Sequence, residues 1–188
     1  MKVFIAGPRA IKKLDEKVIK KLNTMVSKEF TILVGDANGI DTVVQNHFAQ
    51  QLYKNVVVYA SEGKARNNIG GWNVENVSVK KGIKGFQYYA AKDLKMAEDA
   101  DCGLMIWNGE SRGTLNNILN LISMDKKVMV YFQPQREFYA VKSFEDVESL
   151  INLCEQKTKE LFDKLLSENK QIKEYLENLN FQLMLNIV

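Results

Sequence analysis

Short apolar runs alternate along the chain with longer stretches in which apolar residues recur every three or four positions. The runs at 3–6, 32–34 and 56–59 are too short for helices, so they predict buried strands. The stretches at 14–26 and 40–52 carry apolar residues at helical spacing and predict amphipathic helices between those strands. Strand, helix, strand, helix and strand in so few residues predict a parallel sheet with right-handed crossovers.

The same alternation resumes after an irregular stretch at 60–85 that is rich in glycine, asparagine and lysine. Helices are predicted at 86–100 and 114–124, and strands at 102–107 and 128–132. The predicted sheet therefore has five strands and is mainly parallel, and the chain is predicted to have an α/β fold.

Beyond Ser143 the apolar spacing becomes continuously helical, with charged residues between the apolar ones. It predicts one long helix or two shorter ones broken near Asn169. We therefore divide the chain into a sheet-containing domain at 1–140 and a helical extension at 141–188. The extension either packs on the sheet domain or pairs with another subunit; we expect a homo-oligomer, and the apolar end FQLMLNIV predicts a buried terminus.

Composition narrows the function classes. The 188 residues are 46% hydrophobic, enough for the core of one globular domain, and 26 basic against 23 acidic residues give a net charge of only +3. So mild a balance, with no long basic run, leads us not to expect nucleic acid as a partner. Two cysteines and one histidine support neither a disulfide framework nor a metal site nor a histidine-dependent triad. No run is long enough to span a membrane, so we expect a soluble cytoplasmic protein with no membrane partner.

A tight polar turn follows the second predicted strand. Gly35 and Gly39 bracket it, and the Asp36 and Asn38 side chains can hydrogen-bond to nearby backbone. The next helix is predicted to begin near Asn38, so its unpaired N–H groups would attract an anion. Asp41, in the first helical turn, either caps the helix or accepts a hydrogen bond from a ribose hydroxyl.

Similar polar turns follow two other strands, at 7–9 and 108–114, the latter with Ser111 as the predicted helix cap. Because ligands of open α/β sheets bind outside the carboxyl ends of the strands, we expect the three turns to meet in one cleft. In the long loop, residues 74–79 could add an edge strand. Arg66 either grips a phosphate or is solvated, and Trp72 either stacks on a base or anchors the loop.

Four segments in order carry a resemblance to a known superfamily: VFIAGPR, VGDANGIDTVVQNHFA, RNNIGGW and AEDADCGLMIWNGESRGTLNNI. Together they resemble the SLOG superfamily of Rossmann-like nucleotide-binding proteins, and most of all its small YspA-type branch, over about residues 1–132. The turn VGDANGID also resembles that of the Smf DNA-processing proteins. The last segment resembles LOG phosphoribohydrolases and nucleoside deoxyribosyltransferases.

The resemblance implies a Rossmann-like three-layer sandwich that binds a nucleotide-like small molecule. It places the phosphate near Gly113 and Thr114, and the ribose or base near the other two turns; backbone donors and a hydroxyl at a helix start suit phosphate oxygens. Ser111 and Arg112 either add donors or act as a cap and a solvated side chain, and solvation is favoured for Arg112. No cofactor is required, although magnesium could accompany a bound phosphate. The predicted ligand-binding residues are Gly7, Pro8, Arg9, Gly35, Asp36, Asn38, Gly39, Asp41, Arg66, Trp107, Ser111, Gly113, Thr114 and Asn117.

Asn117 is a departure from this resemblance. In the relatives that cleave glycosidic bonds, a glutamate occupies the position four residues after the glycine of the glycine-threonine pair. An amide cannot act as a nucleophile or stabilise an oxocarbenium-like centre as a carboxylate can. We therefore expect a nucleotide sensor or sequestering protein. The alternative is a hydrolase of an N-glycosidic bond in which Asp41 or Glu110 replaces the glutamate. Single-stranded nucleic acid binding is a third and weaker hypothesis.

Overall fold

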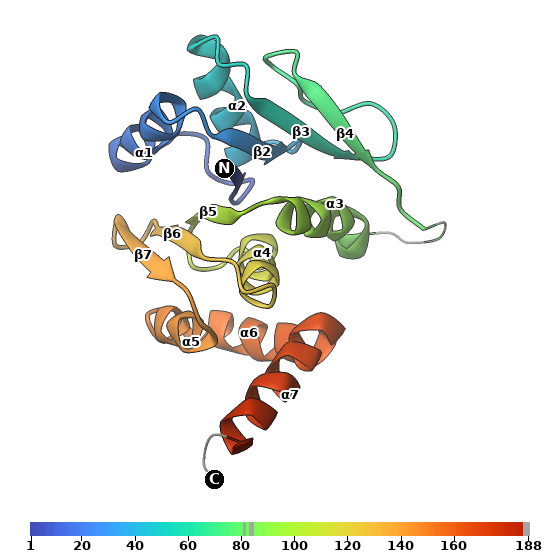
Figure 1. Ribbon diagram of the computed structural model, residues 1–188. Helices are drawn as coiled ribbons and strands as arrows, with labels where there is room; N and C mark the ends of the chain where they lie inside the picture. Colours follow the sequence, from blue (N-terminus) through green and yellow to red (C-terminus); the bar gives the residue numbers. More distant parts are fainter. Residues whose placement is uncertain (81, 83–84, 186–188) are drawn as a thin grey trace.

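The computed structural model describes residues 1–80, 82 and 85–185, of which 170–171 and 180–185 are described by their backbone alone. In this part of the chain a seven-stranded sheet has the order β4-β3-β2-β1-β5-β6-β7 (Figure 1). Every neighbouring pair is parallel except β6 and β7, which are antiparallel. The strands are β1 (Lys2–Ala6), β2 (Thr31–Gly35), β3 (Val56–Ser61), β4 (Asn73–Val77), β5 (Cys102–Trp107), β6 (Val128–Phe132) and β7 (Glu137–Val141).

Helices cover both faces of the sheet. The apolar sides of α1 and α2 pack on one face, in a cluster that contains Val18 and Phe48, while α3 and α4 pack on the other, around Met96 and Ile118. The helices are α1 (Glu16–Ser27), α2 (Ile40–Gln50), α3 (Phe86–Asp99), α4 (Arg112–Ile122), α5 (Phe144–Asn152), α6 (Gln156–Glu168) and α7 (Lys170–Leu185). The predicted α/β sandwich of the Rossmann-like kind is confirmed.

The sheet is larger than the five strands expected from the sequence. Strand β4 is the edge strand that residues 74–79 were expected to add, but β7 was not anticipated. It returns from β6 through a short turn, and only its last residue, Val141, is buried, although residues 138–141 are all apolar. Half-buried edge strands lack the signal by which buried parallel strands are recognised.

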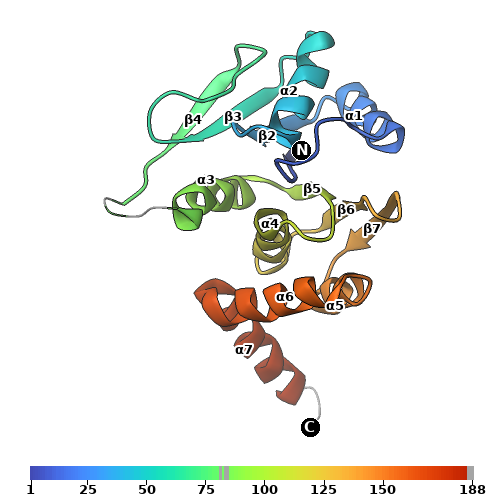
Figure 2. The same ribbon diagram turned by 180° about the vertical axis from the view of Figure 1, so that it is seen from behind.

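The helical extension consists of α5, α6 and α7, and the predicted break at Asn169 separates the last two. A further break before α6 was not predicted. Both views show α6 running past the outer side of α4 (Figures 1 and 2). Phe144, Val147 and Leu165 are buried in the same cluster as α4, so these residues pack within the chain. Homo-oligomerisation stays a prediction. The predicted burial of the apolar end at 181–188 depends on side chains that lie outside the described part of the structure.

The order of the strands creates a crevice beside β1. From β1 the chain proceeds outward through β2 and β3 on one side, whereas β5 and β6 lie on the other. The connections therefore diverge at the carboxyl ends of β1 and β5, which is where ligands bind in open α/β sheets. No helix in the described part of the chain is long and apolar enough to cross a membrane.

Candidate functional site

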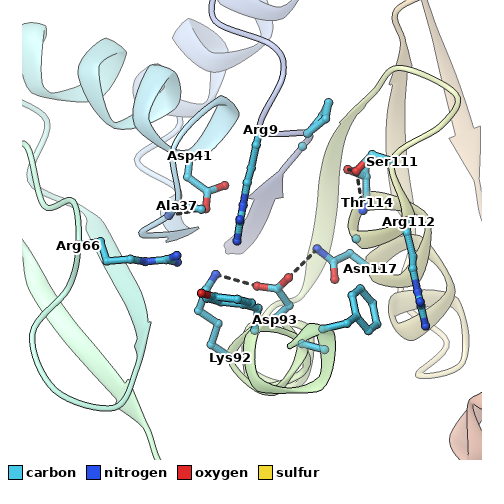
Figure 3. Close-up of a pocket in the computed structure, with 16 residues that line it drawn as sticks. Arg9, Ala37, Asp41, Arg66, Lys92, Asp93, Ser111, Arg112, Thr114 and Asn117 are labelled. Carbon is cyan, nitrogen blue, oxygen red and sulfur yellow. Dashed lines mark hydrogen bonds and ion pairs between the residues drawn. The ribbon is translucent and has the colours of Figure 1, made fainter. Parts of the chain in front are cut away.

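A pocket of about 390 Å³ lies at the carboxyl ends of β1, β2 and β5 (Figure 3). Such a volume falls within the range of roughly 300–1,000 Å³ that is typical of ligand clefts. Nine of the residues predicted from the sequence line it: Gly7, Pro8, Arg9, Asp41, Arg66, Ser111, Gly113, Thr114 and Asn117. The three turns thus contribute to one cleft, as expected. Five predicted residues do not line this pocket: Gly35, Asp36, Asn38, Gly39 and Trp107.

The turn before α2 packs against the turn at 7–9, and the anion site expected at the start of α2 stays a prediction. Helix α2 begins at Ile40 rather than near Asn38, and the Ile40 amide donates to the Pro8 carbonyl at 3.3 Å. Gly39 has a φ of 90°, and a Cβ atom on it would collide with the backbone of Arg9. Both properties require glycine. These contacts hold the first two turns together, and Gly39 has a packing role.

Gly35 and Trp107 pack beneath the site without lining the pocket. A Cβ atom on Gly35 would collide with the side chains of Asp41 and Lys92, so glycine lets both approach the end of β2. Trp107 is fully buried, and its indole N–H donates to the Ser111 carbonyl at 3.2 Å. The prediction that Trp107 contacts a ligand in this pocket is therefore wrong, because it lies beneath the start of α4.

The start of α4 is open toward the pocket. Ser111 is its cap, as predicted, and its Oγ accepts from the Thr114 amide at 3.4 Å. Within the described residues, the amides of Arg112 and Gly113 have no hydrogen-bond acceptor. Nothing lies within 4 Å of the position that a Gly113 Cβ would occupy. Unpaired amides at a helix start carry partial positive charge, so this end of the pocket is suited to a phosphate.

Arg112 differs from the solvated side chain favoured by the sequence. Its guanidinium carbon lies 4.1 Å from the centre of the Phe86 ring, and its Nη2 donates to the Glu168 carboxylate at 3.0 Å. Its Nε is buried and has no hydrogen-bond partner among the described residues. Arg112 is therefore held between α3 and the helical extension.

Helix α3 brings a charged cluster beneath the pocket. Lys92 is 4% exposed, and its Nζ lies 2.8 Å from the Asp93 carboxylate and 3.9 Å from Asp36. Burial alone would lower the pKa of Lys92, but the carboxylates of Asp93, Asp41 and Asp36 outweigh burial and raise it. Lys92 therefore stays charged and partly neutralises the carboxylates around it.

Asp36 acts on the pocket through Arg66. The Asp36 carboxylate accepts from Arg66 Nε at 2.9 Å and from the Arg66 backbone amide at 3.1 Å. Burial opposes ionisation of Asp36, but the Arg66 hydrogen bonds and the charges of Lys92 and Arg66 lower its pKa overall. This pairing fixes the loop that carries Arg66 against the end of β2. Trp72 anchors the same loop, since it is buried and its indole donates to the Tyr53 carbonyl at 2.8 Å.

Arg9 is the cation of the pocket that lacks an acidic partner. No carboxylate of the described residues lies within 4 Å of its guanidinium. Its guanidinium carbon lies 4.9 Å from the centre of the Tyr89 ring, and that of Arg66 lies 5.0 Å from it. In Figure 3, Arg9, Arg66 and Lys92 converge on the same space from three different elements. Tyr89 and Arg9 therefore offer an aromatic surface and an available positive charge at one opening.

Asn117 presents an unsatisfied acceptor to the pocket. Its side chain is buried, with 3% exposure, and its Nδ2 donates weakly to Asp93 at 3.5 Å. Its Oδ1 is buried and has no partner in the described part of the structure. A buried carbonyl without a donor is costly, so a ligand hydroxyl or N–H would be a favourable partner. The pocket thus offers donors at the α4 start and an acceptor deeper inside.

Asp41 is a carboxylate with an unusual pKa. It lines the pocket with 7% exposure, and its Oδ2 accepts from the Ala37 amide at 3.1 Å. Burial, followed by the charges of Asp93 and Asp36, raises its pKa to about 6 against the opposing effect of Lys92. Its carboxylate therefore changes charge near neutral pH, which is a common property of functional sites. Glu110, the other carboxylate proposed for chemistry, is exposed and lies outside the pocket.

The stability of the Asp41→Asn variant relative to the parent protein should increase as pH rises from 4 to 7. The folded pKa of Asp41 lies above its unfolded value of 3.8, so its favourable contribution is present below pH 4 and lost as pH rises through 6. Asparagine has no such loss. We expect the difference in unfolding free energy between the variant and the parent protein to grow by about 2–3 kcal/mol over this range. Urea unfolding at each pH measures it, and a difference independent of pH would refute the raised pKa.

The contribution of α3 to the pocket was not predicted from the sequence. Phe86, Tyr89, Ala90, Lys92 and Asp93 line it, together with Ala37. The available signal was a lysine and an aspartate side by side on a helix that otherwise supplies packing residues. Within the described residues, no group of three or more histidine, cysteine or acidic side chains is arranged to hold a metal ion.

Comparisons with known proteins identify the fold but no family. No protein-family model and no curated protein matches the chain. A solved structure of DNA processing protein A from Helicobacter pylori, described as having a unique single-stranded DNA binding mode, is similar with a TM-score of 0.56. The two chains are 14% identical, and the match covers 89% of this chain and 81% of that one. This chain shares its fold with a DNA-processing protein. That agrees with the Smf part of the resemblance.

The same comparison corrects one prediction about partners. Nucleic acid was not expected, because the net charge of +3 is mild. The similar structure belongs to a protein that binds single-stranded DNA, so this fold gives no ground for excluding nucleic acid. Net charge was a poor guide because it averages over the whole surface, whereas Arg9, Arg66 and Arg112 gather at one pocket.

Proposed function

We propose that this protein binds a phosphorylated nucleotide unit in the pocket beside β1. The proposal depends above all on the open start of α4, where the unpaired amides of Arg112 and Gly113 lie next to the buried, unpartnered Oδ1 of Asn117. In the proposed complex the phosphate accepts from these amides and from Arg9. Asn117 and Asp41 accept hydrogen bonds from a sugar hydroxyl or a base N–H, and Tyr89 contacts the base.

The nucleotide unit could come from a free nucleotide or from a single strand of DNA. The two sources share a phosphate, a sugar and a base, and the similar fold of a single-stranded DNA-binding protein supports including the second. They differ in salt dependence, because a strand that contacts several cations releases several counterions on binding.

Thermal unfolding with a panel of ligands tests the proposal. The panel holds the common mononucleotides, NAD, ADP-ribose, cyclic nucleotides and a single-stranded dodecanucleotide. At a concentration of about 100 Kd, a ligand of the native state should add roughly 2.7 kcal/mol of stability. Stabilisation by a mononucleotide with little salt dependence would indicate a free ligand, and stabilisation by the dodecanucleotide alone, lost at high salt, would indicate DNA. If no compound raises the Tm of well-folded protein, the proposal fails.

A hydrolase of an N-glycosidic bond is the second candidate, and the raised pKa of Asp41 favours it. A carboxyl group with a pKa of about 6 can exchange a proton near neutral pH. The Asp93 carboxylate lies beside Asn117, the position at which a glutamate was expected. Chromatography of nucleotides incubated with the protein would reveal a released base. Loss of that release in Asp41→Asn would favour the enzyme over the binding protein.

A further inference from the structure

A second hollow of about 310 Å³ adjoins the first pocket, between α3, α4 and the end of α6. The two share Phe86, Ala90 and Arg112 as lining residues. The side chains that give the second hollow its chemistry are Phe86, Leu94, Arg112, Asn116, Asn120 and Leu165. Because Leu165 belongs to α6, the helical extension completes this hollow.

Arg112 lies between the two hollows, and only some of its hydrogen-bond donors have partners. It stacks on Phe86 and pairs with Glu168, but its buried Nε has no partner among the described residues. Its backbone amide is one of the two unpaired donors at the start of α4. A phosphate at that position would therefore lie next to the side chain that separates the hollows.

The second hollow combines apolar surfaces with buried amides. Leu94, Leu165 and the Phe86 ring supply apolar contacts, while Asn116 and Asn120 are 6% and 3% exposed. Asn120 Oδ1 accepts from Asn169 Nδ2 at 3.3 Å, and both Asn116 and Asn120 line the hollow. An asparagine amide offers a donor beside an acceptor, which matches the edge of a heterocyclic base. An aromatic ring beside it suits stacking of the same base.

We propose that the second hollow binds a second heterocyclic base, so that the full ligand carries two bases joined through phosphate. This inference rests on the proposed function of the first pocket. One nucleotide occupies the first pocket, its phosphate lies at the start of α4 beside Arg112, and the next base enters between Phe86 and the buried asparagines. Two sources share this chemistry: a free dinucleotide and two consecutive nucleotides of a single DNA strand.

Isothermal titration with mononucleotides and dinucleotides tests the inference. The probes are the four deoxynucleoside 5′-monophosphates, the corresponding 5′-phosphorylated dinucleotides, NAD and a dodecanucleotide. Stacking of one further base is worth roughly tenfold or more in affinity, so the best dinucleotide should bind at least about tenfold more tightly than its mononucleotide. Preference for NAD over the dodecanucleotide identifies a free dinucleotide as the source, and the reverse identifies DNA.

A variant that fills only the second hollow makes the test specific. Ala91 lines that hollow but not the first pocket, and leucine there retains the helix. Ala91→Leu should abolish the dinucleotide gain and change mononucleotide affinity less than about twofold. Glu98→Leu adds a leucine at an exposed position of the same helix, outside both hollows, and should retain the gain.

The outcomes separate this inference from the proposed function. Mononucleotide binding without a dinucleotide gain would refute the second base site and leave the first pocket standing. An equal loss of both affinities in Ala91→Leu would also refute it, because the effect would then not be confined to the second hollow. If neither mononucleotides nor dinucleotides bind, the proposed function and the inference fail together.

Discussion

Replacing Gly113 with glutamate should weaken nucleotide binding at least about 100-fold while leaving the fold intact. The new carboxylate would occupy the open space at the start of α4 and compete for the unpaired amides proposed to bind phosphate. A hydrogen bond to a charged group contributes about 1.5–3 kcal/mol, so the loss of two accounts for a change of this size. An acidic residue in the first turn of a helix is otherwise favourable, so the Tm should not fall. Titration calorimetry and thermal unfolding measure the two effects.

Gly113→Ala is the matched control. A methyl group meets no atom within 4 Å at this position, and alanine is better than glycine within a helix by about 0.5–1 kcal/mol. The alanine variant should therefore be slightly more stable and should bind nucleotide far better than the glutamate variant. Equal binding by the two variants would show that the start of α4 does not receive the phosphate.

Lys92→Met should lower the free energy of unfolding by about 3–5 kcal/mol. The substitution removes a buried cation that faces three carboxylates, and breaking a buried ion pair from one side has a cost of this size. The charge of Lys92 lowers the pKa values of Asp41 and Asp36, so both should rise without it, and the loss should be larger at pH 8 than at pH 5, where these carboxyl groups can take up protons. Urea unfolding at both values of pH measures this.

Lys95→Met provides the comparison on the same helix. Lys95 pairs with Asp99 at 2.7 Å, but its side chain is 40% exposed, and ion pairs open to solvent contribute little to stability. A loss for Lys92→Met no larger than that for Lys95→Met would mean that Lys92 is not needed to balance the buried carboxylates.

The central strands and the turns of the site could be predicted because their signals are local. Buried parallel strands are continuous apolar runs, and a polar turn directly after such a run has to lie at the carboxyl end of the strand. Gly7, Arg9 and Gly113 were found in this way. Strand β7 was missed because an antiparallel edge strand needs only one buried face, and Val141 is the one buried residue of this short strand.

The contribution of α3 could not be derived from local signals. Tyr89, Lys92 and Asp93 lie within a helix, and a lysine next to an aspartate normally indicates a solvated surface. Only the packing of α3 against the sheet and α4 places them under the pocket. Trp107 shows the opposite error, since its position at the end of a strand indicated a ligand contact although its side chain is buried in the core.

In the proposed complex, the charged cluster beneath the pocket would determine the orientation in which a nucleotide binds. Asp36, Asp41 and Asp93 surround the buried Lys92 in this cluster, whereas the unpaired amides at the start of α4 lie on another side of the pocket. The carboxylates of the cluster would repel a phosphate, so the sugar would lie toward the cluster and the phosphate at the start of α4. A longer nucleic-acid chain would continue from that phosphate at the start of α4, so its phosphodiester linkage could leave the pocket without passing through the protein.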